Sequence, residues 1–437
     1  CGGYKISFVK NKYLLGVINL SIRQRRNMMV FDTAYTYKIM TERNLSAFVT
    51  TRDIGGFFNH VWTVHSVASL FCSPSSGLRY GRPIVRKLNE QHTHIEGKIG
   101  RFEKLAWFPA LNFLFAQVDL IWFLMKLIKQ NRIAIIRAED PYFNGILGLI
   151  ISRIKSLPLI IGVWSNPEAI RVDTKKTLSP RLKWMWLERM VERFILRRAD
   201  RAIAGNLNNM DFILSHGVNK ESTEVIRIGS ALYAPHFVDP SKRDSGMADL
   251  LSVGVTGQRI LMCISRLESL KFTDHMIRAV ACLKGRGLNI KAIYVGDGEY
   301  KSDLAKLAEE LSVTDQIIFC GNQDQDWICR VVPHVAVVVA PLTGRALAEA
   351  ALGGAPIAAY DTDWQNEIIE HGITGELVPF LDYSSMADSI EKILKDDEYA
   401  DKIGTNVRER TLNMMDPKKI NKVLTDLYEN LIVPKDF

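Results

Sequence analysis

The chain has few cysteines, and their spacing matches neither a metal site nor a disulfide framework. Six cysteines are scattered through 437 residues, and no two of them have Cys-x-x-Cys spacing. Cys263, Cys282 and Cys320 fall inside predicted strands or helices. This pattern favours buried free thiols in a reducing compartment and argues against zinc.

The sequence also lacks a long uninterrupted apolar run. Its most apolar stretch is 107–128, which is interrupted by Pro109, Asn112, Gln117, Asp119 and Lys126. A membrane-spanning helix needs about 20 apolar residues with few polar interruptions. We therefore expect a helix that is buried or lies at an interface. No signal peptide is recognisable before it, and we expect a cytoplasmic protein.

Neither charge sign dominates. Lys and Arg number 56 against 48 Asp and Glu, a net charge of +8, and hydrophobic residues make up 47% of the chain. This composition is that of an ordinary globular protein with room for two or three domains. The mild basicity favours anionic partners, such as a membrane surface or a phosphorylated substrate, and is too diffuse to indicate nucleic acid.

No strand is followed by Gly-x-Gly-x-x-Gly, which argues against a dinucleotide oxidoreductase. Strands and helices nevertheless alternate, and the pattern restarts after a turn-rich stretch. It predicts an α/β protein with two doubly wound, Rossmann-like parallel sheets facing a cleft. We expect an extension at 1–26, a first domain at 27–235, a linker at 236–256, a second domain at 257–412, and a C-terminal helix at 413–437 that could cross back to the first domain.

In the first half, polar residues follow predicted strands at 28–31, 46–50, 133–136 and 159–163. Because parallel strands in an open sheet present their carboxyl ends to the ligand crevice, these residues are candidates for one side of a ligand site. They are Asp32, Asp53, Glu139, Asp140, Trp164 and Asn166. Capping of the following helix is the structural alternative for Asp140. His92 and His94 lie in a polar stretch without a third ligand nearby, so we expect exposed loop histidines and no metal.

In the second half, the stretch 340–356 reads as strand end, tight loop and helix start. It follows a β-branched run at 335–339, turns at 341–344, and enters a helix that ends at Gly353 and Gly354. Such a helix start offers unpaired N–H groups and a positive dipole end to an anion. The hypothesis is that this loop holds the phosphates of a nucleotide and that Glu349, one turn inside the helix, holds its ribose.

A basic segment covers 175–201. It holds nine Lys and Arg residues against Glu188, Glu192 and Asp200, a surplus of 9 − 3 = +6. Arg189, Arg193 and Arg197 recur every four residues, and two tryptophans lie near the start. A basic amphipathic helix with tryptophans can lie on an anionic membrane surface, and a solvated face of a packed helix is the alternative.

Five motifs in the second half resemble the family 4 retaining glycosyltransferases, which have the GT-B architecture. They are Ser265-Arg266-Leu267-x-x-x-Lys271, Gly296-Asp297-Gly298, Phe319-Cys320-Gly321, the run from Glu349 to Pro356, and the run from Glu367 to Pro379. Their order over about 120 residues makes the resemblance specific, although each motif alone is weak. The first half matches in layout far more than in motif.

The resemblance implies a retaining transferase that takes a sugar from a nucleoside-diphosphate sugar and adds it to a glycan or lipid-linked acceptor, without metal or other cofactor. Arg266 and Lys271 would neutralise the diphosphate, and Glu349 would bind the ribose; these three are the implied catalytic residues. The implied donor-binding residues are Gly298, Gly321, Thr343, Gly344, Arg345, Ala346 and Leu347.

Two positions depart from the family pattern. Where the family has a Glu eight residues before the ribose-binding one, this chain has Pro341, and where it often has a His after a first-domain strand, this chain has Trp164. Both family residues contact the transferred sugar, so Arg345, Glu139, Asp140 or Asn166 could substitute. The departures leave open a degenerate nucleotide-sugar-binding scaffold, or a sugar-nucleotide epimerase of the same architecture.

Overall fold

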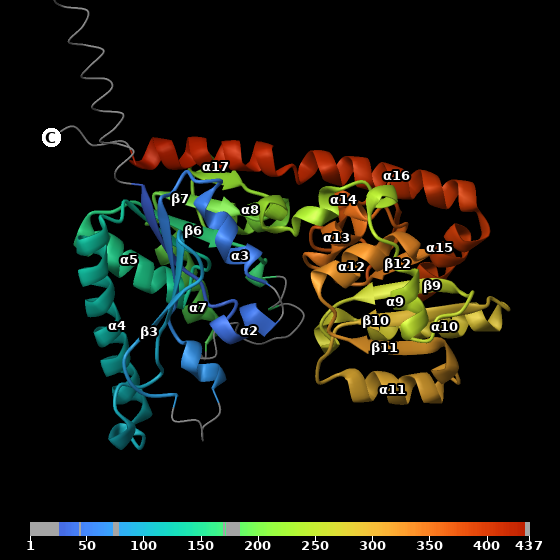
Figure 1. The fold of residues 1–437 in the computed structure, drawn as a ribbon, viewed down its shortest axis with the longest axis horizontal. Helices are drawn as coiled ribbons and strands as arrows, with labels where there is room; N and C mark the ends of the chain where they lie inside the picture. Colours follow the sequence, from blue (N-terminus) through green and yellow to red (C-terminus); the bar gives the residue numbers. More distant parts are fainter. Residues whose placement is uncertain (1–25, 43–44, 73–77, 169–170, 172–183, 433–437) are drawn as a thin grey trace, which may run out of the picture.

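The computed structural model describes residues 26–42, 45–72, 78–168, 171 and 184–432. They form two domains side by side, and helices α16 and α17 run along one edge of both (Figure 1). The predicted fold class is confirmed, because each domain is built on one mostly parallel sheet with helices on its faces. The predicted N-terminal extension, apart from Arg26, lies outside the described residues.

The first sheet has eight strands in the order β3-β4-β2-β1-β5-β6-β7-β8, and only β3 is antiparallel to its neighbour. Along β1, Met28 and Val30 pack into one core while Met29 and Phe31 pack into another, as expected of a strand covered on both faces. The strands are β1 (Asn27–Phe31), β2 (His60–His65), β3 (Ile84–Lys87), β4 (His92–Glu96), β5 (Ile135–Ala138), β6 (Leu159–Val163), β7 (Arg201–Ala204) and β8 (Thr223–Val225).

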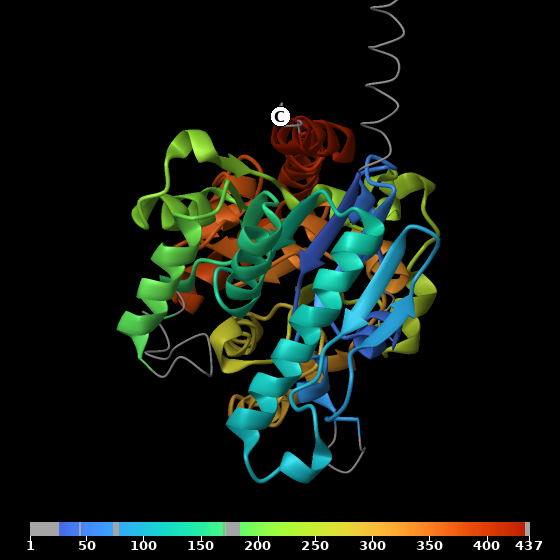
Figure 2. The ribbon, with the colours of Figure 1, turned by 90° about the vertical axis from the view of Figure 1, so that its left-hand side faces the viewer.

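The helices of this domain include α4, which lies on the side turned away from the second domain and crosses the front of Figure 2. They are α2 (Tyr37–Glu42), α3 (Ala47–Thr50), α4 (Pro109–Asn131), α5 (Phe143–Lys155), α7 (Met185–Leu196) and α8 (Leu207–Ser215). By length and composition alone, α4 could cross a membrane, and about a third of its most apolar stretch (33%) is buried.

The second sheet has six parallel strands in the order β11-β10-β9-β12-β13-β14. They are β9 (Arg259–Ile264), β10 (Ile290–Val295), β11 (Ile317–Gly321), β12 (Val337–Ala340), β13 (Ile357–Tyr360) and β14 (Glu376–Val378). Its helices are α9 (Met247–Ser252), α10 (Asp274–Gly285), α11 (Lys301–Glu310), α12 (Gln325–Val331), α13 (Ala346–Leu352), α14 (Gln365–Ile368), α15 (Tyr383–Lys395) and α16 (Asp397–Met414).

The last helix, α17 (Pro417–Ile432), packs against the first domain although it is nearly 400 residues from β1 in the printed sequence. Its buried residues Ile420, Leu424, Leu427 and Tyr428 share one core with Met28 and other first-sheet residues. The end of the chain therefore completes the core of its beginning.

The prediction of a strand at 46–50 is wrong, because this segment forms helix α3. The amides of Val49 and Thr50 both donate to the carbonyl of Ser46, at 2.9 Å each. Both edges of β1 are already occupied, by β2 on one side and β5 on the other, so no strand position was left beside it.

The prediction of exposed loop histidines is also wrong. His92 and His94 lie in β4, each only 1% exposed, between β2 and β3. Strands β3 and β4 were missed because their sequences are polar and lack an apolar run. The backbone hydrogen bonds to neighbouring strands stabilise them instead.

Candidate active site

Each sheet changes direction at one point in its strand order. In the second sheet the change falls between β9 and β12, and in the first it falls between β1 and β5. Ligands of open α/β sheets bind beyond the carboxyl ends of the strands at such a point. The predicted residues Arg266, Lys271 and Thr343 follow β9 and β12, while Asp32 and Glu139 follow β1 and β5.

Three of the sequence motifs form the wall of the second-domain site together. The amide of Gly296 donates to the carbonyl of Gly321 at 2.7 Å, and the amide of Leu267 donates to the carbonyl of Asp297 at 3.1 Å. A Cβ atom added at Gly298 would lie 2.2 Å from the carbonyl oxygen of Leu267. Glycine is required there because two strand-end loops touch backbone to backbone.

The two predicted cations differ in their surroundings. The Arg266 side chain is 68% exposed and pairs with Glu268 at 2.8 Å. Lys271 lies in a short 3-10 turn, Ser269–Lys271, where burial and then the nearby Arg266 charge lower the pKa of its amine. An anion between them would relieve their mutual repulsion.

A buried glutamine fixes the loop that precedes α13. Gln365 accepts a hydrogen bond from the amide of Thr343 at 2.8 Å and donates to the carbonyls of Ala340 and Tyr360 at 3.1 and 2.8 Å. Trp364 donates to the carbonyl of Thr343 at 3.1 Å. The amides of Gly344, Arg345 and Ala346 take part in none of the hydrogen bonds recorded between described residues, whereas that of Leu347 donates to Gly344.

Glu349 is 2% exposed and is covered by Arg345. The Arg345 Nε atom lies 2.7 Å from the Glu349 carboxylate. The guanidinium also stacks over the ring of Phe48, from α3 of the first domain, at 4.4 Å from its centroid. Arg345 thus lies between the predicted ribose ligand and the opposite domain, a contact that nothing in the sequence indicated.

The first domain presents a cavity of about 400 Å³ at the β1/β5 point. Its charged floor is a network: Arg52 pairs with Asp32, while Glu139 lies 3.0 Å from Arg137 and accepts a hydrogen bond from the Trp164 indole at 2.6 Å. The walls include Phe48 and, from the C-terminal helix, Ile420 and Leu424. The cavity thus combines paired charges with an apolar side.

Two carboxyl groups of this cavity have shifted pKa values of opposite sign. Burial raises the pKa of Asp140 to about 6, against hydrogen bonds from the Tyr142 amide and Asn144. Burial also opposes the ionisation of Asp32, but the Arg52 guanidinium outweighs it and lowers the pKa of that carboxyl. Asp140 therefore ionises closer to neutral pH than Asp32 does.

Two predicted residues lie apart from the cavity lining. Asp53 belongs to the 3-10 turn Thr51–Asp53 and accepts from the amide of Gly56 at 3.2 Å. Asn166 instead donates to the side chain of Asn208 at 2.8 Å. Asn208 in turn donates to Asp363 of the second domain at 2.7 Å, so Asn166 lies at the contact between the domains.

Residues that the sequence interpretation left without a role make the remaining contacts between the domains. Glu367 pairs with Arg227 and accepts from the amide of Leu207 at 2.9 Å. Glu367 begins one of the five sequence motifs, the run from Glu367 to Pro379, so the sequence did mark this residue. Asn208 and Asp363 carried none, because their partnership spans more than 150 residues of sequence.

Within the described part of the chain, no group of three or more His, Cys, Asp or Glu side chains is arranged to hold a metal ion. Positive charge near the loops that follow β9 and β12 comes chiefly from three side chains, Arg266, Lys271 and Arg345.

The second domain matches a known family. Residues 253–410 match the family described as glycosyl transferases group 1. Alpha-D-kanosaminyltransferase of Streptomyces kanamyceticus is 26% identical over 267 residues, which are 59% of this chain and 66% of that protein. The chain spans about half to two thirds of the length of the curated relatives it matches, 47% to 66% in three of them.

Solved structures extend the likeness to the whole fold. Anabaena Alr3699/HepE, in complex with UDP, has a TM-score of 0.69 and 18% identity, covering 93% of this chain and 100% of that chain. Sucrose-phosphate synthase from Thermosynechococcus elongatus has a TM-score of 0.71 and 18% identity, covering 93% and 99%. The resemblance inferred from the motifs is confirmed: residues 253–410 match the glycosyl transferases group 1 family, and the chain has the two-domain GT-B fold of these solved structures.

Proposed function

We propose that this protein is a retaining, metal-independent glycosyltransferase. It moves a sugar from a nucleoside-diphosphate sugar to a glycan or lipid-linked acceptor in cell-surface polysaccharide synthesis. One observation carries the proposal: Arg266, Lys271 and the Gly344–Ala346 amides follow β9 and β12 of one domain, a carboxylate-lined cavity follows β1 and β5 of the other, and Arg345 stacks on Phe48 in the wall of that cavity. A diphosphate on one side and a hydroxyl acceptor on the other fit these two halves.

The donor would bind to the second domain. Arg266 and Lys271 would pair with the diphosphate, and their charge would stabilise it as it leaves the anomeric carbon. Gly298 and Gly321 shape the wall beside the base, and Glu349 would accept hydrogen bonds from the ribose. Because Arg345 now covers Glu349, donor binding would have to displace Arg345, which could then reach the diphosphate.

The acceptor would bind in the first-domain cavity. Asp32, Glu139 and Trp164 offer a polar floor, and the Trp164 indole offers a flat apolar face for a sugar ring. Asp140, with its pKa raised to about 6, can exchange hydrogen bonds with an acceptor hydroxyl near neutral pH. The proposal involves no resident cofactor, since the nucleotide sugar supplies the activated group.

Turnover of nucleotide sugars by site variants tests this proposal. Arg266→Ala and Glu349→Ala should each reduce transfer from UDP-, GDP- or dTDP-sugars by orders of magnitude. Arg259→Ala is the matched control, because Arg259 is an exposed arginine at the opposite end of the same strand, β9. Unchanged rates in both site variants would refute the proposal.

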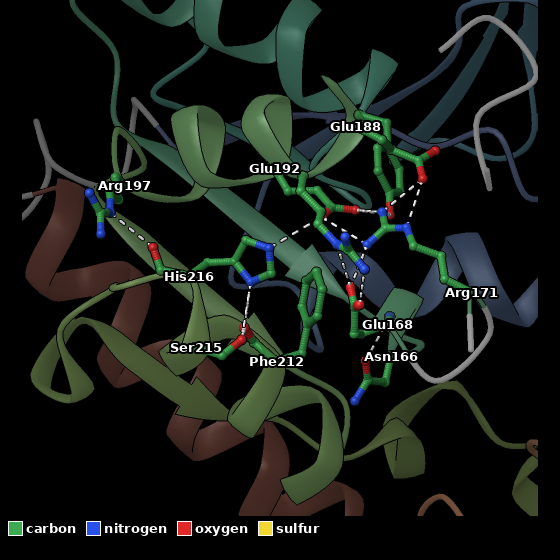
Figure 3. A network of polar contacts seen from close by, with 11 residues as sticks. Asn166, Glu168, Arg171, Glu188, Glu192, Arg197, Phe212, Ser215 and His216 are labelled. Atoms are coloured by element: carbon green, nitrogen blue, oxygen red, sulfur yellow. Dashed lines mark hydrogen bonds and ion pairs between the residues drawn. The ribbon is translucent and has the colours of Figure 1, made fainter. Parts of the chain in front are cut away.

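We also propose that the first domain lies on an anionic membrane surface at the cytoplasmic face. Helix α7 turns its glutamates inward, since Glu188 and Glu192 are fully buried and bind Arg171 (Figure 3). Its arginines point outward, among them Arg193. Residues 175–183 of the predicted basic segment lie outside the described residues.

Helix α4 packs into the same core as α7 and adds an exposed apolar face. Large exposed side chains recur from just before this helix, at Trp107 (90% exposed), into it, as far as Trp122 (69% exposed). The others are Phe108, Leu111, Leu114, Phe115 and Val118. Exposed apolar faces of this extent with neighbouring cations are typical of helices at a bilayer interface.

Vesicle co-sedimentation tests the membrane proposal. Arg193→Glu should weaken binding to vesicles rich in anionic lipid by roughly tenfold, because each basic residue near such a surface contributes about 1 kcal/mol. Trp122→Gln should weaken binding as well, and Lys402→Glu, an exposed reversal on α16, should have little effect. Equal binding to neutral and anionic vesicles would count against an anionic surface.

A further inference from the structure

Asp363 holds an unusual position at the edge of the cleft. It follows β13 with a φ angle of 52°, a left-handed conformation that residues other than glycine rarely adopt. Its neighbours Trp364 and Gln365 are buried and bind the backbone of Thr343. The side chain of Asp363 is therefore held beside the loop that precedes α13, on a rigid support.

The Asp363 carboxylate lies where the two domains meet. One oxygen accepts a hydrogen bond from Asn208 of the first domain at 2.7 Å, and Asn208 is bound to Asn166, beyond β6, at 2.8 Å. Within its own domain, burial raises the pKa of Asp363, and the nearby charge of Lys271 acts in the opposite direction. Asp363 thus lies near the predicted diphosphate-binding cation and is bound to a residue of the opposite domain.

The transferred sugar would have to occupy this region. Its anomeric carbon is bonded to the diphosphate at one side, near Lys271, and must be reached from the first-domain cavity at the other. Asp363 is exposed, and its second carboxylate oxygen takes part in none of the hydrogen bonds recorded between described residues. A carboxylate oxygen accepts hydrogen bonds from sugar hydroxyls.

The loop after β12 lacks a carboxylate that could bind the sugar, and the turn after β13 can supply one through Asp363. Pro341 offers no side-chain acceptor, and its carbonyl lies 3.4 Å from the Gln365 amide that helps to hold the turn of Asp363. The turn after β13 and the loop after β12 therefore form one surface. The Asp363 carboxylate on the turn after β13 can accept hydrogen bonds from a sugar that is bound against the loop after β12.

We propose that Asp363 binds hydroxyl groups of the donor sugar and helps to determine which sugar is accepted. The inference rests on the proposed function, since it presupposes a nucleotide-sugar donor. Asn208 acts as a positioning residue that orients the Asp363 carboxylate when the domains are in contact.

Binding measurements on the full chain separate the sugar from the nucleotide. Isothermal titration with UDP and UDP-glucose, and with GDP and GDP-mannose, gives the affinity that the sugar adds to the nucleotide. In Asp363→Asn and Asp363→Gly, affinity for the bare nucleotide should stay within about twofold, whereas affinity for the nucleotide sugar should fall roughly tenfold. Asp363→Gly suits the left-handed backbone and so guards against misfolding.

Asp361→Asn is the matched control, an exposed carboxylate two residues away that binds Asn366 at 3.0 Å. With Asp363→Asn, KM for the sugar donor should rise, and a deoxy-sugar nucleotide lacking the bound hydroxyl should lose no further affinity. Undiminished nucleotide-sugar affinity in both Asp363 variants would overturn the inference while leaving the proposed function intact. Failure of the unmodified chain to bind or use any of these donors would instead refute the proposed function.

Discussion

Glu139 is the carboxylate on which the charge balance of the first-domain cavity depends. It lies 3.0 Å from Arg137 and 3.7 Å from Arg52, and the Trp164 indole donates to it at 2.6 Å. Its side chain is 8% exposed, and Arg137 has no other carboxylate partner among the described residues, whereas Arg52 also pairs with Asp32. Removing Glu139 leaves the buried charge of Arg137 without its carboxylate partner.

We therefore expect Glu139→Ala to lower the free energy of unfolding by about 3–5 kcal/mol, as measured by urea denaturation. Asp53→Ala should change it by less than about 1 kcal/mol, because Asp53 carries only a local turn contact. Equal effects of the two substitutions would show that the network contributes little to stability.

His94 makes stability depend on pH. Burial lowers the pKa of His94 to about 4, and nearby Glu96, His65, Asp32 and Arg52 also act on it. Because the unfolded histidine titrates near 6.5, the unfolded chain binds more protons below that pH. The neutral imidazole therefore contributes its full stability above pH 6.5, and this is lost as pH falls toward 4.

Melting temperatures between pH 7 and pH 4.5 should fall accordingly, and the loss attributable to His94 is on the order of 2–3 kcal/mol. His94→Leu should flatten this part of the profile, since neither ring nitrogen has a recorded hydrogen-bond partner among the described residues. A variant with the same pH profile as the original chain would assign the effect to other groups, such as His65.

Single residues were predictable from sequence where they follow an apolar run. Asp32 and Glu139 come directly after β-branched or apolar strands, so their place at a strand end could be inferred from the sequence alone. Asn208 and Asp363 could not be paired in this way. Their contact depends on how two separately folded sheets are placed relative to each other, which no local pattern encodes.

Among elements, the turn after β13 acts as a clamp on the loop after β12. Gln365 is fully buried and holds the loop through its side-chain oxygen and nitrogen. Gln365→Ala would leave the Thr343 amide and two carbonyls unpaired in the interior. The expected cost is about 2–4 kcal/mol of stability, together with a higher KM for the nucleotide sugar.

Gln365→Glu is informative beside it, because it keeps the acceptor for Thr343 but loses the donor to Ala340. Comparing Gln365→Ala with Gln365→Glu by thermal melting and donor titration shows whether the acceptor oxygen or the donor nitrogen of Gln365 contributes more to stability and to donor binding. A normal KM for both variants would mean that the loop keeps its shape without the clamp.

Helix α3 shows where element prediction from sequence fails. Its composition, with Phe48 and Val49, favours a strand, yet it forms one helical turn because the sheet has no free edge beside β1. The helix then presents Phe48 to Arg345. The long apolar runs of β6 and β10 are predicted correctly as strands, because they are interior strands of the sheets and do not compete for a position beside them.

At the scale of the molecule, the C-terminal helix belongs to the N-terminal core. Tyr428 is fully buried, packs edge-on against Phe58 and accepts a hydrogen bond from Arg137 at 3.2 Å. Tyr428→Ala should destabilise the first domain by about 3–5 kcal/mol. Tyr428→Phe should cost only about 1 kcal/mol, because it keeps the ring.

Differential scanning calorimetry with and without nucleotide checks this expectation. The transition that shifts with nucleotide reports the second domain and should stay near its original temperature in Tyr428→Ala. A joint fall of all transitions would show that the two domains unfold as one unit.

The chain passes between the domains twice, once between β8 and β9 and once between α16 and α17, and the two passages touch. A Cβ atom on Gly229 would lie 1.9 Å from the carbonyl oxygen of Met415, and Ser230 donates to Asn421 at 2.7 Å. Any rotation of one domain against the other would therefore turn about this shared point. Contacts between the domains that lie far from it, such as Asn208 with Asp363, would separate more than those that lie close to it.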